Sequence, residues 1–264
     1  MRFIFNKKIN SIFNEVAEVG LALWQKGWAE KNAGNISVNI SEFIIEKENT
    51  NLFHYFSLNK CYPILSGQYL LVTSTGSRMR DIIKNPEASA CIIKVSDDGN
   101  GYYLLSDHNI DLKPTSELPT HLAIHELLIE NGSKEKAIVH THPNTLIALS
   151  HIVEYKNEAN LNKLLWSMHS ETYMMLPRGA GFISYSTPGS DELASKTFRE
   201  FAYHKVLIWE KHGCIAIGKD VFEAFDLIDI VSKSAEIFFT CRNAGFIPEG
   251  ITDRQLEKIK KQAL

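Results

Sequence analysis

The fold class of this chain is decided by residues 90–105, which read ACIIKVSDDGNGYYLL. Two apolar runs, 90–95 and 101–105, flank Asp97-Asp98-Gly99-Asn100, a turn sequence that favours a β-hairpin. An antiparallel pair at this position breaks the strict β-α-β alternation of a parallel sheet. We therefore expect an α/β fold with a mixed, mainly antiparallel central sheet and helices on both faces.

Outside this hairpin, hydrophobic periodicity predicts the remaining elements. Strands are expected at 36–40, 69–72, 137–140, 172–176, 181–185, 206–209 and 214–217. Helices are expected from Ser11 (as N-cap) to about 28, at 118–130, 190–204 and 221–245, and after Thr252. Residues 41–63 are read as an irregular surface segment. No repeat, low-complexity tract or linker occurs, so one domain over residues 1–264 is expected.

Composition excludes several classes of function. The chain carries 28 basic and 31 acidic side chains without a basic stripe, so nucleic acid is not an expected partner. The four cysteines are scattered, which indicates neither a disulfide framework nor a zinc ribbon and fits a reducing compartment. No apolar run is long enough for a signal peptide or a membrane helix. We expect a soluble, cytoplasmic protein with no membrane partner.

Candidate metal ligands follow the apolar run 137–139. His140 and His142 are two residues apart, so on a strand both imidazoles project from one face and can reach one cation. That pattern alone fits ordinary polar histidines equally well. His212 adds a third imidazole in a tight turn, 211–213, between two predicted strands. Three neutral histidines with an open position are the ligand set of a catalytic zinc.

Other polar residues have an ordinary reading beside a functional one. Glu117, at the start of the predicted helix 118–130, can simply complement the helix dipole. Three short stretches offer hydroxyl and backbone N–H groups to a phosphate, although each is also a common turn. These stretches are Gly34-Asn35, Ser74-Thr75-Gly76 and Thr115-Ser116. Glu171 reads as solvated surface. The histidines at 121, 125, 151 and 204 read as surface or core-edge residues rather than ligands.

Five stretches, in order from about residue 21 to 245, resemble the class II aldolase/adducin family. They are KGWAEKNAGNIS at 26–37, KPTSELPTH at 113–121, HTHPNTLIALSH at 140–151, STPGSDEL at 186–193 and LIWEKHGCIAIG at 207–218. Their order and spacing are far more specific than any single H-x-H pair. The resemblance implies a single-domain class II aldolase-like fold.

The resemblance also implies a function. The expected activity is that of a zinc-dependent lyase that cleaves L-rhamnulose 1-phosphate reversibly into dihydroxyacetone phosphate and L-lactaldehyde. One Zn²⁺ per subunit is assigned to His140, His142 and His212, and proton transfer to Glu117. Glu171 would assist at the aldehyde end across a subunit boundary of a homotetramer with intersubunit active sites. Substrate and phosphate contacts are assigned to Asn32, Gly34, Asn35, Ser74, Thr75, Gly76, Thr115 and Ser116.

The chain departs from the family pattern at two places. Family members carry glycine where Ala33 stands, and a glycine and a lysine in the loop that here reads TSTGSR at 73–78. The phosphate contacts are therefore less firmly assigned than the metal ligands. Two alternatives stay open. One is a related sugar-phosphate enzyme, such as a fuculose-phosphate aldolase, a ribulose-phosphate epimerase or a dehydratase. The other is a non-catalytic adducin-like module, which would be expected to have lost the metal ligands.

Overall fold

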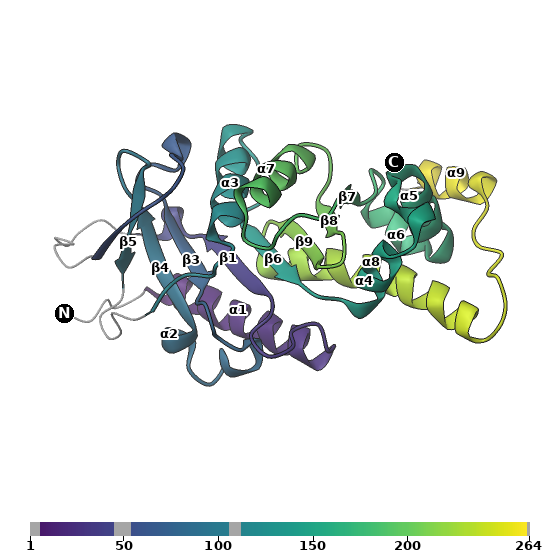
Figure 1. Cartoon of the computed structure of the whole chain (residues 1–264), viewed down its shortest axis with the longest axis horizontal. Helices are drawn as coiled ribbons and strands as arrows, with labels where there is room; N and C mark the ends of the chain where they lie inside the picture. Colours follow the sequence, from purple (N-terminus) through teal and green to yellow (C-terminus); the bar gives the residue numbers. More distant parts are fainter. Residues whose placement is uncertain (1–5, 45–53, 106–111, 263–264) are drawn as a thin grey trace.

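The computed structural model describes residues 6–44, 54–105 and 112–262, and within them nine strands form one sheet (Figure 1). The strands are β1 (Asn35–Asn39), β2 (His54–Ser57), β3 (Tyr69–Thr73), β4 (Ala90–Val95), β5 (Gly101–Leu105), β6 (Ala137–Thr141), β7 (Gly181–Ile183), β8 (Val206–Trp209) and β9 (Gly213–Gly218). Their order is β2-β5-β4-β3-β1-β6-β9-β8-β7. Every described pair is antiparallel except β7–β8. The expected mixed, mainly antiparallel sheet is confirmed.

The hairpin that decided the fold class forms as expected. Strand β4 pairs with β5, with Ile92 opposite Leu105 and Ile93 opposite Leu104. In the turn, a carboxylate oxygen of Asp98 accepts a hydrogen bond from the Asn100 backbone N–H at 3.0 Å. The reading of 41–63 as irregular was wrong in part, because His54–Ser57 forms the edge strand β2 against β5. Residues 45–53 of that segment lie outside the described residues.

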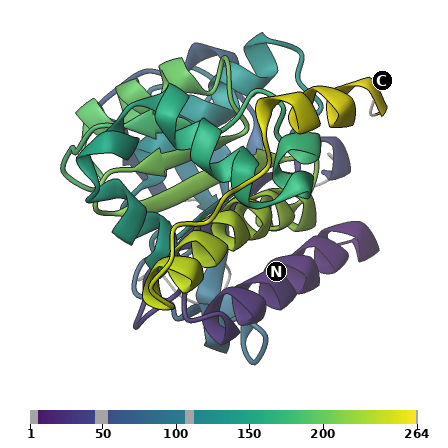
Figure 2. The same cartoon turned by 90° about the vertical axis from the view of Figure 1, so that its right-hand side faces the viewer.

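Helices cover both faces of the sheet, as expected. They are α1 (Lys7–Gln25), α2 (Pro86–Ser89), α3 (Leu118–Glu130), α4 (Asn144–Ser150), α5 (Glu158–Met168), α6 (Ser170–Met175), α7 (Asp191–Glu200), α8 (Val221–Asn243) and α9 (Asp253–Gln262). Helices α1 and α8 lie side by side on one face, and α3 and α7 pack together on the other (Figures 1 and 2). Neighbouring residues of a strand point to opposite faces of the sheet. On β6, Val139 therefore packs in the core beneath α1 and α8, and Ile138 packs in the core beneath α3 and α7.

One helix prediction needs correction at its start, and another is confirmed there. Helix α1 begins at Lys7 rather than after Ser11, because the Asn6 side chain accepts hydrogen bonds from Lys8 and Ile9 N–H at 3.0 Å. Ser11 instead bonds Glu15 one turn along. Ser190 caps α7 as expected, and accepts from Leu193 N–H at 3.2 Å.

The predicted strand 172–176 was wrong, because this segment lies within and just after helix α6. Its run TYMML suggested a strand, since β-branched and aromatic residues favour that conformation. Packing against α8 overrides that propensity: the Thr172 hydroxyl lies 2.7 Å from the Ser234 hydroxyl and 3.3 Å from the Ile230 carbonyl oxygen. Met174 and Met175, which would point to opposite faces of a strand, are both about half exposed.

Among the described residues, no helix is both long and apolar enough to cross a bilayer. The prediction of one domain over residues 1–264 stays a prediction.

Candidate metal centre and active site

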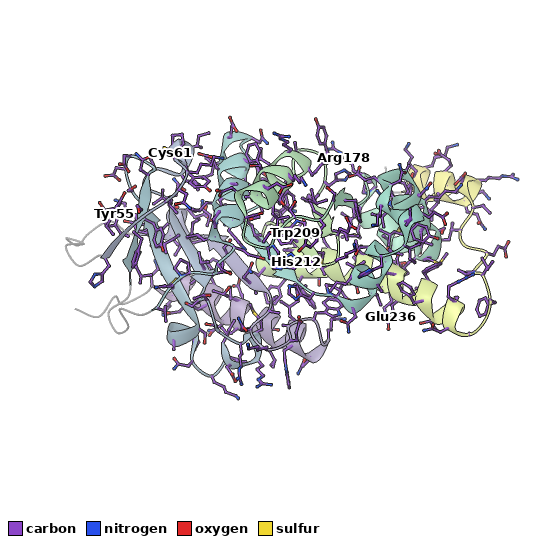
Figure 3. The ribbon with its side chains drawn as sticks, in the orientation of Figure 1. Tyr55, Cys61, Arg178, Trp209, His212 and Glu236 are labelled. Carbon is purple, nitrogen blue, oxygen red and sulfur yellow. The ribbon has the colours of Figure 1, made fainter. Side chains whose placement is uncertain are left out.

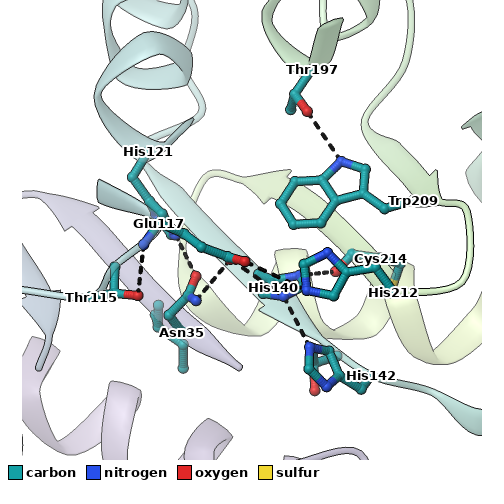
Figure 4. A network of polar contacts seen from close by, with 12 residues as sticks. Asn35, Thr115, Glu117, His121, His140, His142, Thr197, Trp209, His212 and Cys214 are labelled. Carbon is teal, nitrogen blue, oxygen red and sulfur yellow. Dashed lines mark hydrogen bonds and ion pairs between the residues drawn. The ribbon is translucent and has the colours of Figure 1, made fainter. Parts of the chain in front are cut away.

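Three histidines from two sequence segments meet at the end of β6. Strands β6 and β9 pair with Thr141 opposite Cys214, which places the β8–β9 turn beside His140 and His142. Gly213 lets the turn approach closely, because an added Cβ would lie 2.4 Å from the Thr141 carbonyl oxygen. One potential ligand atom of each histidine lies within 4.8 Å of the others (Figure 4). His140, His142 and His212 are called the three-histidine site below.

The hydrogen bonds of this site fix which nitrogens carry protons. His140 Nδ1 lies 2.8 Å from the Cys214 carbonyl oxygen, and His142 Nδ1 lies 3.0 Å from Glu30 Oε1. Both partners only accept, so each Nδ1 donates and each Nε2 keeps a lone pair. These two Nε2 atoms face each other at 3.1 Å. Nitrogens bound tetrahedrally to one zinc are about 3.3 Å apart, so the pair fits a cation between them.

Burial keeps His140 and His212 neutral. It lowers the pKa of His140 well below its usual value, with His142 lowering it further. Burial, followed by the neighbouring His140, lowers the pKa of His212 to about 3. Neutral imidazole is the form that binds a metal ion. The Nε2 atom of His212 faces the site, 3.5 Å from Glu117 Oε1, and its Nδ1 is buried without a hydrogen-bond partner in the described chain.

Glu117 points into the three-histidine site. It occupies the N-cap position of α3, yet its side chain makes no capping hydrogen bond. Oε2 lies 3.4 Å from His140 Nε2, and Oε1 lies 3.5 Å from His212 Nε2. Asn35, directly opposite His140 in the β1–β6 pairing, donates from Nδ2 to Glu117 Oε2 at 3.0 Å. A buried carboxylate therefore stands beside the place where the imidazole nitrogens converge.

Comparison with known proteins accounts for this arrangement. Residues 14–239 match the family described as Class II Aldolase and Adducin N-terminal domain. The chain belongs to this family. Rhamnulose-1-phosphate aldolase of Bacteroides thetaiotaomicron is 42% identical over 248 residues, 93% of this chain and 91% of that protein. The enzyme of that name from Salmonella dublin is 34% identical over 244 residues, 90% and 88% of the two chains. The crystal structure of a sugar-phosphate aldolase from Thermotoga maritima matches with TM-score 0.78 and 35% identity, over 92% of this chain and 100% of that one.

Two of the loops that the family resemblance assigned to phosphate lie side by side. Ser74 bridges to Pro114, the Thr75 N–H donates to the Lys113 carbonyl at 2.8 Å, and the Thr115 N–H donates to the Thr73 carbonyl at 3.0 Å. The third loop approaches β6, because Gly34 has φ of +80° and an added Cβ would lie 3.0 Å from the His140 carbonyl oxygen. Exposed positions available to a ligand are Asn32, Thr75, Gly76 and Ser116, while Asn35, Ser74 and Thr115 are buried.

Glu171 is not brought to the three-histidine site by this class II aldolase fold. It lies in the first turn of α6, which packs against α5 and α8 (Figure 1). Its carboxylate is 3.0 Å from His169 Nε2 and accepts from the Ser170 hydroxyl at 2.7 Å. The side chain is 57% exposed, so it stays available to another molecule. Its assigned role in a neighbouring subunit stays a prediction.

Trp209 is a site residue that the sequence reading did not single out. Near the middle of the molecule, its indole lies against the rings of His140 and His212, with centroids 4.5 and 5.1 Å apart (Figures 3 and 4). Its Nε1 donates to the Thr197 hydroxyl on α7 at 3.1 Å. The indole thus forms an apolar wall that keeps water from one side of the imidazoles. The sequence signal that could have singled out Trp209 was its place in the stretch 207–218, which resembles class II aldolases.

His121 and His125 were read as surface or core-edge residues, and that reading was wrong. Both are fully buried, at 0% and 1% exposed. Burial lowers the pKa of His121 to about 4 and that of His125 to about 3. His121 Nε2 contacts Asn35 Oδ1, on the side of the amide away from Glu117. The missed signal was spacing: Glu117, His121 and His125 are four residues apart and share one face of a helix.

Proposed function

We propose that this chain is a metal-dependent lyase that cleaves L-rhamnulose 1-phosphate reversibly into dihydroxyacetone phosphate and L-lactaldehyde. The observation that carries the proposal is Glu117, 3.4 Å from His140 and 3.5 Å from His212 in a site with a third convergent histidine. Three convergent imidazoles beside one carboxylate match a catalytic metal site with a general acid–base group. Family membership and two relatives named rhamnulose-1-phosphate aldolase support the choice of substrate.

The metal we propose is Zn²⁺, one ion per chain, held by the three-histidine site. Such an ion would supply Lewis-acid chemistry, stabilising the negative charge that develops as a carbon–carbon bond of the ketose breaks. The donor set fits, because two imidazole lone pairs face each other at 3.1 Å and His212 Nε2 lies 3.5 Å from the Glu117 carboxylate beside them. Imidazole sites also accept iron or cobalt, so elemental analysis decides the metal.

Glu117 is the group we assign to proton transfer. In the cleavage direction, the carbon–carbon bond breaks as the hydroxyl group on the carbon that becomes the aldehyde loses its proton to a base at the aldehyde end. Protonated Glu117 then gives a proton to the carbon that becomes the hydroxymethyl carbon of dihydroxyacetone phosphate, and condensation reverses both transfers. Asn35 orients the carboxylate, and Trp209 excludes water from one side. The paired loops around Ser74 and Thr115 are proposed to hold the phosphate through hydroxyl and backbone N–H groups.

The same proposal includes an assembly and a location. Glu171, exposed on α6, would act on the aldehyde end of a substrate held by another subunit of a homotetramer. We propose that the protein works in the cytoplasm. Size-exclusion chromatography with light scattering tests the assembly, and a monomer with full activity would remove this role for Glu171.

The deciding experiment is a retro-aldol assay on a panel of ketose phosphates. Zinc-loaded protein is given L-rhamnulose 1-phosphate, L-fuculose 1-phosphate and L-ribulose 5-phosphate, and release of dihydroxyacetone phosphate is measured beside isomer formation. Fastest release from L-rhamnulose 1-phosphate, lost on chelation and regained with zinc, is expected. Isomer formation alone would instead favour an epimerase, and full activity in metal-free protein would exclude the metal-dependent route.

A further inference from the structure

A buried chain of hydrogen bonds leads away from Glu117 into the core beneath α3 (Figure 4 shows its first three members). Asn35 Nδ2 is 3.0 Å from Glu117 Oε2, and Asn35 Oδ1 contacts His121 Nε2. His121 Nδ1 is 2.6 Å from the Ser37 hydroxyl, which is 2.8 Å from His125 Nε2. The four residues behind Glu117 are each at most 6% exposed, so water does not replace these contacts.

The chain is built from two polar stripes that face each other. Glu117, His121 and His125 follow one another at intervals of four along one face of the α3 region. Asn35 and Ser37 are two apart on β1 and therefore project from one face of the strand. The face of β1 that would normally be apolar thus carries an amide and a hydroxyl group, and each of them contacts an imidazole on the helix. Burying five polar groups here is costly unless every one is paired.

The donors and acceptors can be assigned along the whole chain. A carboxylate only accepts, so the Asn35 amide turns its NH₂ group to Glu117 and its carbonyl oxygen to His121. His121 must then donate from Nε2. Being neutral, it accepts at Nδ1 from the Ser37 hydroxyl. The Ser37 oxygen in turn accepts from His125 Nε2–H. Each hydrogen bond of the chain therefore has one assigned donor, and the donors follow one another from His125 toward Glu117.

We propose that His121 is a positioning residue: supported by Ser37 and His125, it fixes the amide orientation of Asn35, which holds Glu117 between His140 and His212. An asparagine amide can rotate by half a turn at little steric cost. In the rotated form its carbonyl oxygen would face the Glu117 carboxylate, two acceptors in contact, and its NH₂ would face a donor. The His121 N–H excludes that rotamer. The importance of Glu117 for turnover rests on the proposed function.

Three variants at one position separate this role from simple packing. His121→Gln reaches Asn35 and can keep a donor near the place of Nε2. His121→Asn is too short to reach Asn35 but can keep the contact with Ser37. His121→Leu removes both. The Asn and Leu variants should lose about tenfold to a hundredfold in kcat, with kcat/KM falling in parallel, and the Gln variant should recover most of it. Full kcat in the Leu variant, or a Gln variant as impaired as Leu, would overturn the proposal.

A second readout needs no turnover and uses the wild-type protein. With ¹⁵N-labelled histidine and zinc present, NMR should find His121 and His125 as neutral Nε2–H tautomers at pH 7, with signals assigned by their loss in the His121→Gln and His125→Gln variants. A protonated Nδ1 on His121 would overturn the assigned chain whatever the turnover of the variants. If wild-type protein releases no dihydroxyacetone phosphate while the tautomers are as expected, the proposed function fails and the hydrogen-bond chain stands.

Discussion

Within the described residues, two regions bring three potential metal-binding side chains together, and the two regions differ in how deeply these side chains are buried. One is the three-histidine site. The other, called here the α5–α7 cluster, consists of Glu158, Glu200 and His204. In each region the three ligand atoms lie within 4.8 Å of one another. Proximity alone therefore does not separate a metal site from a group of polar residues that happen to be neighbours.

Two members of the α5–α7 cluster, Glu158 and His204, already make hydrogen bonds within the chain. One carboxylate oxygen of Glu158 accepts from the Phe182 N–H at 2.9 Å, and the other lies 3.6 Å from His204 Nε2. His204 Nδ1 donates to the Gly179 carbonyl at 3.1 Å. The first bond connects α5 to the edge strand β7, and the second connects the segment after α7 to the residues just before β7. The Glu158 side chain is 40% exposed, so its charge is hydrated without a cation.

The three-histidine site is more deeply buried, with the side chains of His140 and Glu117 1% and 6% exposed. Two imidazole lone pairs face each other there, beside the Glu117 carboxylate, and little water can reach them. Buried polar groups are normally paired, so we expect a bound cation to complete this set. Burial of the converging lone pairs, rather than closeness alone, therefore favours the three-histidine site as the metal site. The following experiments test this distinction.

The largest expected effect is the loss of metal from one region only. His212→Ala removes one of three ligands and leaves only His140 and His142, so dialysed protein should retain no stoichiometric zinc and show no measurable ketose cleavage. His204→Ala is the matched control, with an expected one zinc per chain and normal turnover. Zinc measured by plasma mass spectrometry decides the outcome. Zinc lost from the control and kept in His212→Ala would reverse the assignment of the two regions.

A smaller effect should follow from changing a carboxylate in each region. Glu117→Gln keeps the shape and the contact with Asn35 but cannot transfer a proton, so turnover should fall about a hundredfold or more while zinc stays bound. Glu158→Gln, the control in the α5–α7 cluster, should leave turnover unchanged. Steady-state kinetics on L-rhamnulose 1-phosphate measure both. Near-normal turnover of Glu117→Gln would remove its assigned role.

Local patterns predicted much of the fold and part of the site. The 90–105 hairpin follows from turn chemistry and two short apolar runs, which act over a few residues. The shared direction of His140 and His142 follows from strand periodicity. By contrast, the segment 172–176 became helical through contacts with α8, some sixty residues away. No local propensity records such a contact, so this part of the fold had to be observed.

The buried histidines of α3 were missed for a related reason. A histidine in an amphipathic helix is usually at its edge, and hydrophobicity alone gives no ground for burying one. What buries His121 and His125 is the polar stripe on β1, where Ser37 bonds both rings. The partner lies more than eighty residues away. Only the pairing of two elements reveals that these polar side chains satisfy each other.

Burial of these imidazoles should also appear as a pH dependence of stability, the smallest effect of the set. The folded protein keeps His125 neutral down to a pKa of about 3, whereas the unfolded chain takes up a proton below about 6.5. Between these values the unfolded state binds more protons, so stability falls as pH falls. In metal-free protein, His125→Gln should reduce that slope by about 1.4 kcal/mol per pH unit between pH 6 and pH 4.5. Urea unfolding at three pH values measures it. An unchanged slope would mean that His125 takes up a proton as readily in the folded protein as in the unfolded chain, which would contradict its place in a dry hydrogen-bond chain beneath α3.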